Sequence, residues 1–207
     1  SDSRTMPPRR LLSLGCLAVL LAVGPGVETA FAESPPGKPK APKTIDPTPP
    51  LVPIPGARVS EAGLLVGGQP SRADLVAIQR AGSQTVISLR TASETGDEGE
   101  QARVERLGMK FVSIPVPGPA GLTESNARSL RKALNEQDAL PAVVHCLSGQ
   151  RSAALIGLAA FVVDRVSPAA AIDLAKGLGL STLEGALRER IRAICKADPS
   201  RNCGGVK

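Results

Sequence analysis

The sequence predicts an α/β protein in which a central, mostly parallel sheet of about four strands is flanked by helices. Short apolar segments rich in β-branched residues alternate with amphipathic segments of helical length, an order typical of parallel sheets. Only three Phe and no Trp or Tyr occur in 207 residues. A core must therefore be assembled from Leu, Val, Ile and Ala, which suits a sheet covered by helices.

The predicted elements follow one another from residue 64 onward. Strands are expected at 64–70, 84–90, 110–116 and 142–146. Helices are expected at 71–82, 100–108, 123–137, 152–165, 167–177 and 181–195. Ser71 and Thr123 are of the type that caps a helix N-terminus, and Gly82 can end the first helix.

The chain divides into four regions by composition. Residues 1–32 resemble a secretory signal, because two arginines precede an apolar stretch and Ala-Phe-Ala at 30–32 forms a cleavage site. A Pro-rich linker (33–55), the α/β domain (56–195) and a C-terminal tail (196–207) follow. We expect cleavage near Ala32, a secreted or periplasmic location, and no stable membrane span afterwards. A retained N-terminal anchor is the alternative.

Charge indicates which classes of partner the protein can bind, and cysteine content bears on the redox compartment. The net charge of +6 favours anionic substrates, but no dense Lys/Arg stripe with interleaved aromatic residues occurs, which argues against nucleic acid. In an oxidising compartment Cys195 and Cys203 could close a small loop, or they could remain two thiols. Because Cys16 lies in the predicted signal segment, the mature chain would hold three cysteines, and Cys146 is then the odd one out in either case.

The stretch HCLSGQRS, residues 145–152, carries the chemistry. A strand ends at Cys146, the chain turns through Gly149, and a helix begins near Arg151, so successive backbone N–H groups can form a nest for an anion. The same positive field would lower the pKa of the Cys146 thiol and make it nucleophilic. Arg151 offers a planar fork for oxyanions, Ser152 can hydrogen-bond the sulfur, and His145 can orient the loop. A buried structural cysteine is the alternative.

This stretch resembles the signature loop of the protein tyrosine phosphatase-like cysteine phosphatases. The segments VGGQPS, AGSQTVISLR, LGMKFVSIPV and VVHCLSGQRSAALIG also occur in the order of the bacterial beta-lactamase hydrolase-like phosphatase branch. The resemblance implies that Cys146 attacks phosphorus, Arg151 binds the phosphoryl oxygens and Ser152 assists the second step. It implies hydrolysis of phosphate monoesters, on small molecules or phosphoproteins, without metal or cofactor. The backbone that would cradle the anion belongs to Leu147, Ser148, Gly149 and Gln150.

Two departures from that pattern keep alternatives open. Cys146 and Arg151 are separated by four residues rather than five, which is also the loop length of rhodanese-type sulfurtransferases. A sulfurtransferase using a Cys146 persulfide and a non-catalytic phosphate- or sulfate-binding module are therefore the alternatives to a phosphatase.

The second departure concerns the general acid. The loop PVPGPAGLTES, residues 115–125, has no Asp. Glu124 is its nearest carboxylate, although a helix-capping role is the alternative. Asp97, Glu98 and Glu100 lie in an acidic loop and could swing in as the acid, and a solvated loop is the alternative. Arg90 ends a neighbouring strand, where it would line the pocket or hold the acidic loop by a salt bridge.

Overall fold

The computed structural model describes residues 52–60, 62–94, 99–201 and 203–204. The predicted signal segment, most of the predicted linker, and Asp97 and Glu98 lie outside these residues. Within the described ranges, no helix combines the length and the hydrophobicity that crossing a membrane requires.

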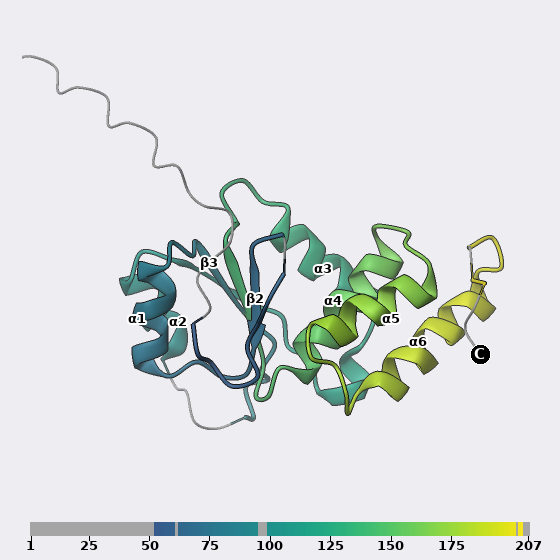
Figure 1. Cartoon of the computed structure of the whole chain (residues 1–207), viewed down its shortest axis with the longest axis horizontal. Helices are drawn as coiled ribbons and strands as arrows, with labels where there is room; N and C mark the ends of the chain where they lie inside the picture. Colours follow the sequence, from purple (N-terminus) through teal and green to yellow (C-terminus); the bar gives the residue numbers. More distant parts are fainter. Residues whose placement is uncertain (1–51, 61, 95–98, 202, 205–207) are drawn as a thin grey trace, which may run out of the picture. The chain divides into compact units, whose positions relative to one another are not determined.

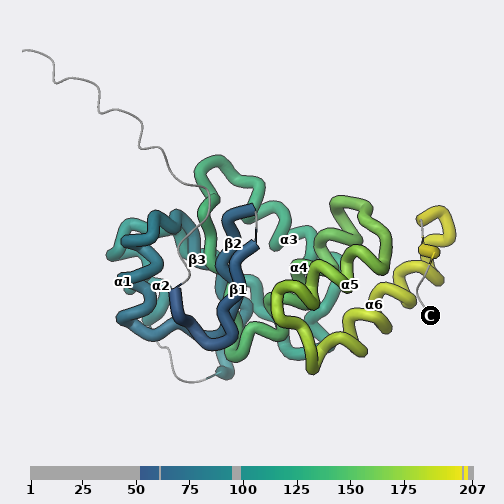
Figure 2. The backbone as a smooth tube through the Cα atoms, viewed as in Figure 1, coloured from purple at the N-terminus to yellow at the C-terminus, as the bar shows by residue number. Residues whose placement is uncertain are grey.

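A five-stranded sheet forms the centre of the domain, in the order β1-β2-β5-β3-β4. The predicted mostly parallel sheet is confirmed, because β2, β5, β3 and β4 are mutually parallel. Only β1 pairs antiparallel, and it lies at the edge beside β2 (Figure 2). The strands are β1 (Arg58–Val59), β2 (Leu64–Gly67), β3 (Thr85–Ser88), β4 (Lys110–Ser113) and β5 (Ala142–His145).

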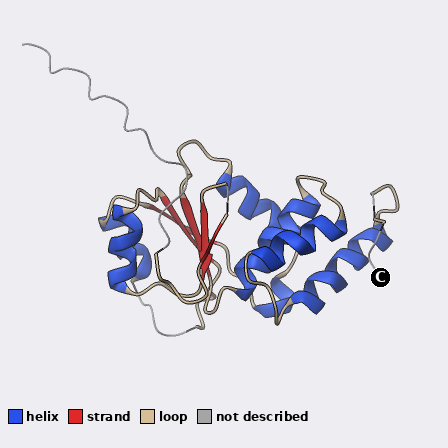
Figure 3. Cartoon of the chain, in the orientation of Figure 1, coloured by secondary structure: helices blue, strands red, loops and turns tan. Residues whose placement is uncertain are grey.

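Helices cover both faces of this sheet (Figures 1 and 3). The helices α1 (Arg72–Arg80) and α2 (Glu100–Arg106) lie on one face. The opposite face carries α3 (Glu124–Leu134), α4 (Gln150–Val162), α5 (Pro168–Gly177) and α6 (Glu184–Ala197). Ser71 and Thr123 cap α1 and α3 through their side chains, which confirms both predicted caps.

Each face of the sheet has its own hydrophobic core, and the side chains of the central strand β5 point alternately into one and the other, as successive side chains of a strand do. Val144 belongs to the core under α3–α6, and Val143 to the core under α1 and α2. Cys146, which follows the strand, belongs to the α3–α6 side. The residue between them, His145, therefore faces the α1–α2 side.

Helix α4 is buried along nearly its whole length, from Ser152 to Val162. A helix that is apolar all round is held by packing on all sides, here by α3, α5 and α6. Its first turn is therefore fixed in position relative to the sheet, and that turn carries Arg151.

The C-terminal tail is tied to the domain by a disulfide between Cys195 and Cys203. The side chain of Arg201 lies 5.5 Å from the ring centroid of Phe161 and is only 7% exposed. At the other end of the domain, Val52 and Ile54 are buried in the α1–α2 core, so the end of the predicted linker packs on the domain.

Candidate active site

The loop 146–149 lies at the carboxyl edge of the sheet, between its two neighbouring strands. The register pairs His145, the last residue of β5, with Gly67 on β2 and with Ser88 on β3. Parallel sheets place ligand sites at this edge, where strands pass into helices. The predicted position of the site is therefore occupied by a strand-to-helix turn that leads into α4.

Two glycines of β2 and its extension allow the loop to pack closely. The amide of Gln69 donates to the carbonyl of Leu147 at 3.2 Å, and Gly68 forms a bridge with Ser148. A Cβ on Gly68 would lie only 2.8 Å from the Leu147 carbonyl oxygen, and one on Gly149 would lie 3.2 Å from the backbone of Gly67. Gly149 also has a φ of 87°, which favours glycine.

Replacement of Gly68 by Ala is expected to displace the loop, because the added methyl group meets backbone atoms that cannot turn away. We expect a loss of about 1–3 kcal/mol in the free energy of unfolding, together with weaker phosphate binding. Urea denaturation and calorimetry with inorganic phosphate measure the two effects. Gly185→Ala on α6, where a Cβ meets nothing within 4 Å, is the matched control. Equal behaviour of the two variants would contradict the close packing.

The Cys146 thiol lies in a field that favours the thiolate. Burial is the largest influence and raises the pKa of the thiol, but the backbone N–H groups of Ser152, Ser148 and Arg151, with the Ser152 hydroxyl, outweigh it and lower the pKa. The amide of Gly149 donates to the sulfur at 3.1 Å. The amides of Arg151 and Ser152 belong to the first turn of α4, so they have no acceptor within the helix.

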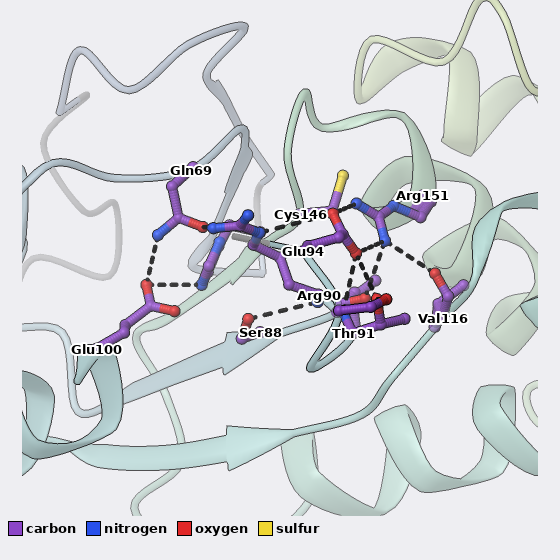
Figure 4. Close-up of polar contacts among 12 residues, drawn as sticks. Gln69, Ser88, Arg90, Thr91, Glu94, Glu100, Val116, Cys146 and Arg151 are labelled. Atoms are coloured by element: carbon purple, nitrogen blue, oxygen red, sulfur yellow. Dashed lines mark hydrogen bonds and ion pairs between the residues drawn. The ribbon is translucent and has the colours of Figure 1, made fainter. Parts of the chain in front are cut away.

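Arg151 is held in place by four hydrogen bonds. Its Nη1 and Nη2 each donate to a carboxylate oxygen of Glu94 at 2.6 Å. Nη1 also donates to the carbonyls of Val116 at 2.9 Å and Leu89 at 3.3 Å. These bonds engage both terminal nitrogens of the guanidinium, and Figure 4 shows Arg151 beside Cys146 and Glu94. Glu94 lies in the acidic loop that follows β3, and the sequence did not mark it as a site residue.

The Glu94–Arg151 pair predicts an acid-sensitive contribution to stability. The hydrogen bond from Arg151 is the largest cause that lowers the pKa of Glu94, from 4.5 to about 2. A lowered pKa stabilises the folded state above the unfolded value, and this stabilisation is lost as the pH falls toward 2. The difference in unfolding free energy between the wild type and Glu94→Gln should therefore be constant above about pH 5 and shrink below 4.5.

Urea titrations at a series of pH values measure that difference. Glu124→Gln is the matched control, since Glu124 is 42% exposed and pairs with Arg128 on the helix surface. A Glu94→Gln difference that stays constant between pH 4.5 and 2 would contradict the role of the pair.

His145 and Glu100 contact each other on the opposite side of the sheet from the thiol. The His145 side chain is fully buried, and its Nε2 lies 3.2 Å from Glu100 Oε1. Glu100 is the first residue of α2 and is 7% exposed, so it is neither in a solvated loop nor free to swing in. Packing of α2 against the sheet buries it. The His145 ring therefore lies on the Glu100 side of the sheet and does not face Cys146, and its role in orienting the loop stays a prediction.

Arg90 contacts the acidic loop, which is one of the two roles that the sequence suggested for it. Its Nη1 donates to Gln69 Oε1 at 2.9 Å, and its Nε lies 3.6 Å from Glu94 Oε2. It also lines a cavity of about 470 Å³, together with Ser88 and Ser113 at the ends of β3 and β4. This cavity is lined by residues in and after β3 and β4 and by the start of α2, and none of residues 145–152 lines it, so a role of Arg90 in the active-site pocket stays a prediction.

The remaining predicted residues take different positions. Ser152 is fully buried in the first turn of α4, on the side of the sulfur. The Gln150 side chain is directed at the loop between α5 and α6, where it donates to the carbonyl of Gly179 and accepts from the amide of Ser181. Leu147 is 60% exposed beside the nucleophile. Gln150 thus contributes to an anion site only through its backbone.

Glu124, the predicted general acid that the structure describes, is engaged away from this arrangement. The Glu124 carboxylate contacts Arg128 at 3.3 Å and Arg201 at 3.6 Å. A 3-10 turn at Gly118–Gly121 fills much of the loop that follows β4. Asp97 lies outside the described residues. Among the residues that the structure describes, no three His, Cys, Asp or Glu side chains are grouped for a metal ion.

Comparisons with solved structures give the fold. No protein-family model and no curated protein matches this sequence. A candidate phosphatase of the DUF442 group from Shewanella putrefaciens is similar, with a TM-score of 0.53 at 17% identity, over 72% of this chain and 92% of that one. The catalytic core of the PP-IP phosphatase Siw14 from S. cerevisiae gives 0.50 at 14% identity, over 72% and 96%.

A third solved structure, a mutant form of Tk-PTP, gives a TM-score of 0.51 at 16% identity, over 67% of this chain and 95% of that one. Together these similarities confirm the predicted fold: the chain has the fold of the tyrosine phosphatase-like cysteine phosphatases.

Proposed function

We propose that this chain, which has the cysteine phosphatase fold, hydrolyses phosphate monoesters through a thiolate nucleophile. The carrying observation is the Cys146 thiol, whose pKa is lowered by the first-turn amides of the helix that also bears Arg151. A nucleophile, a guanidinium and N–H donors directed at the sulfur then lie in one loop and the first turn of α4, which is the arrangement needed for attack on a bound oxyanion.

The reaction has two steps that regenerate the thiolate. The Cys146 sulfur attacks phosphorus, the bond from phosphorus to the ester oxygen breaks, and the leaving oxygen takes a proton from solvent. Water then attacks the phosphocysteine, the sulfur–phosphorus bond breaks, and inorganic phosphate leaves. Arg151 and the loop amides stabilise the equatorial oxygens in both steps. Ser152, buried beside the sulfur, supports its departure in the second step.

Aryl phosphates are the proposed substrates because the described residues place no general acid where it could protonate the leaving oxygen. Glu124 is engaged by Arg128 and Arg201. A missing acid costs a factor of about 10²–10⁴ with a poor leaving group. A phenolate, with a pKa near 10, leaves more easily than an alkoxide. The exposed Leu147 side chain offers an apolar contact for the ring.

Phosphate release from an aryl phosphate and from an alkyl phosphate, each with the reduced protein, tests this function. We expect turnover of the aryl ester and at least tenfold slower turnover of the alkyl ester, since the acid matters most for the poor leaving group. No turnover of either would contradict the proposal. Transfer of sulfur from thiosulfate to cyanide, without phosphate release, would instead support the sulfurtransferase alternative.

Export to an oxidising compartment is part of this proposal. The Cys195–Cys203 disulfide supports it, because structural disulfides persist mainly in secreted and periplasmic proteins. Cell fractionation tests the location. Cys146 has no disulfide partner among the described residues, and its buried position limits its exposure to oxidants.

A further inference from the structure

A continuous polar network lies behind the candidate active site and includes a glutamine with no role in the proposed chemistry. It connects the residue before the nucleophile with the residue that binds the anion (Figure 4). In order along the contacts, its members are His145, Glu100, Gln69, Arg90, Glu94 and Arg151.

Gln69 stands in the middle of this network and joins its two halves. Its Nε2 donates to Glu100 Oε1 at 2.9 Å, and its Oε1 accepts from Arg90 Nη1 at 2.9 Å. Glu100 in turn lies 3.2 Å from His145. Figure 4 shows the amide of Gln69 placed between Glu100 and Arg90.

The two bonds require an amide at this position. An amide donates through nitrogen to a carboxylate and accepts through oxygen from a guanidinium, whereas a carboxylate, an ammonium or an apolar group cannot do both. The neighbours are well shielded: the Glu100 side chain is 7% exposed and that of Arg90 is 10%. In such surroundings hydrogen bonds are strong and misdirected polar groups are costly.

The orientation of Arg90 matters for the anion site because of the next contact in the network. Arg90 Nε lies 3.6 Å from Glu94 Oε2, the same oxygen that accepts from Arg151 Nη2 at 2.6 Å. Glu94 Oε1 also accepts from the amide and the hydroxyl of Thr91, at 2.8 and 3.2 Å. Arg90 therefore acts on the Oε2 side, and an Arg90 without its bond to Gln69 would change the charge beside the oxygen that Arg151 Nη2 binds.

We propose that Gln69 is a positioning residue for the anion site, which fixes Arg90 against Glu94 and thereby holds Arg151 in its binding position. The inference rests on the proposed function for its effect on turnover. Its effect on phosphate binding can be measured whether or not the protein is a phosphatase. The backbone amide of Gln69 also donates to the carbonyl of Leu147 in the nucleophile loop, and a side-chain substitution leaves that bond in place. The effect under test is therefore the one that the side chain transmits through Arg90 and Glu94.

Gln69→Met tests the proposal, since methionine has nearly the same length but can neither donate through an amide nor accept strongly. We expect the dissociation constant of inorganic phosphate to rise about tenfold and kcat/KM to fall by a similar factor, because small misplacements of a binding group cost up to about 100-fold. The pH dependence of Cys146 alkylation should stay unchanged, since the loop amides remain. Calorimetry, kinetics and alkylation with iodoacetamide measure these quantities on the full chain.

The matched control is Gln101→Met, one residue beyond Glu100 on α2. Gln101 is exposed and donates to Glu105 on the helix surface. Its replacement should leave phosphate affinity within twofold. Gln69→Asn, which keeps the amide on a shorter side chain, serves as a second variant if Gln69→Met does not fold.

A double-mutant cycle of Gln69 with Glu94, measured by phosphate affinity, distinguishes a positioning role from a general loss of stability. If Gln69 acts through Glu94, Gln69→Met in a Glu94→Gln background should weaken phosphate binding much less than in the wild type. Additive effects would overturn the proposal. So would a lowered melting temperature with phosphate affinity within twofold of the wild type.

The proposed function and this inference can fail separately. Wild-type protein that binds phosphate without turnover contradicts the phosphatase but still tests Gln69 by affinity. Wild-type protein that binds no phosphate overturns both, because there is then no anion site to position. Turnover with phosphate affinity unchanged in Gln69→Met overturns only the inference.

Discussion

Replacement of Cys146 by Ser is expected to abolish hydrolysis of an aryl phosphate, a loss on the order of 10⁴-fold or more. A serine hydroxyl has a much higher pKa than a thiol, and the loop amides that favour the thiolate cannot produce an alkoxide near neutral pH. Cys146 is fully buried, and oxygen is smaller than sulfur, so the fold should persist. Phosphate affinity should remain, because Arg151 and the amides are unchanged.

Cys195→Ser is the control for this experiment. It removes the disulfide at the end of α6 and leaves Cys146 in place, so turnover should persist while the melting temperature falls. Turnover by Cys146→Ser at more than a few per cent of the wild-type rate would show that another group attacks phosphorus. Phosphate binding without turnover in both the wild type and Cys146→Ser would support the non-catalytic binding module.

Most of the fold was predictable because it depends on local patterns. The apolar segments at β2, β3, β4 and β5 and the helical spacing between them are visible in the sequence, and Ser71 and Thr123 cap their helices as expected. The strands are shorter than predicted, since Gly68 and Pro115 follow the last paired residues of β2 and β4. The edge strand β1 was missed because two residues carry no periodicity.

The site was predictable only where its residues are adjacent in sequence. His145 to Ser152 form one loop, so their types and order already indicate an anion-binding thiolate. Gln69 lies in the loop after β2 and Glu94 in the loop after β3, where they meet Glu100 and Arg151, and nothing in their local sequence marks them. A carboxylate four residues after Arg90 was the only signal for Glu94, and such pairs are common.

Arg151→Lys is the second substitution for which we expect a large effect. A lysine keeps the positive charge but has a single ammonium, which cannot bind both oxygens of Glu94, the carbonyl of Val116 and an anion at once. Loss of a donor aimed at developing negative charge typically costs about 10²–10³ in kcat. We expect a fall of this size in hydrolysis of the aryl phosphate, with weaker phosphate binding.

The same substitution should also lower the free energy of unfolding by about 1.5–3 kcal/mol, because hydrogen bonds to a shielded carboxylate are lost. Arg188→Lys is the matched control: Arg188 bonds Glu184 on the surface of α6, and such pairs contribute about 0.3–0.5 kcal/mol. Equal losses of unfolding free energy in the two variants would mean that the Glu94–Arg151 pair contributes no more than a surface ion pair. A loss confined to Arg151→Lys would mean that the charge of Arg151 is insufficient and that its planar geometry holds both the loop and the anion.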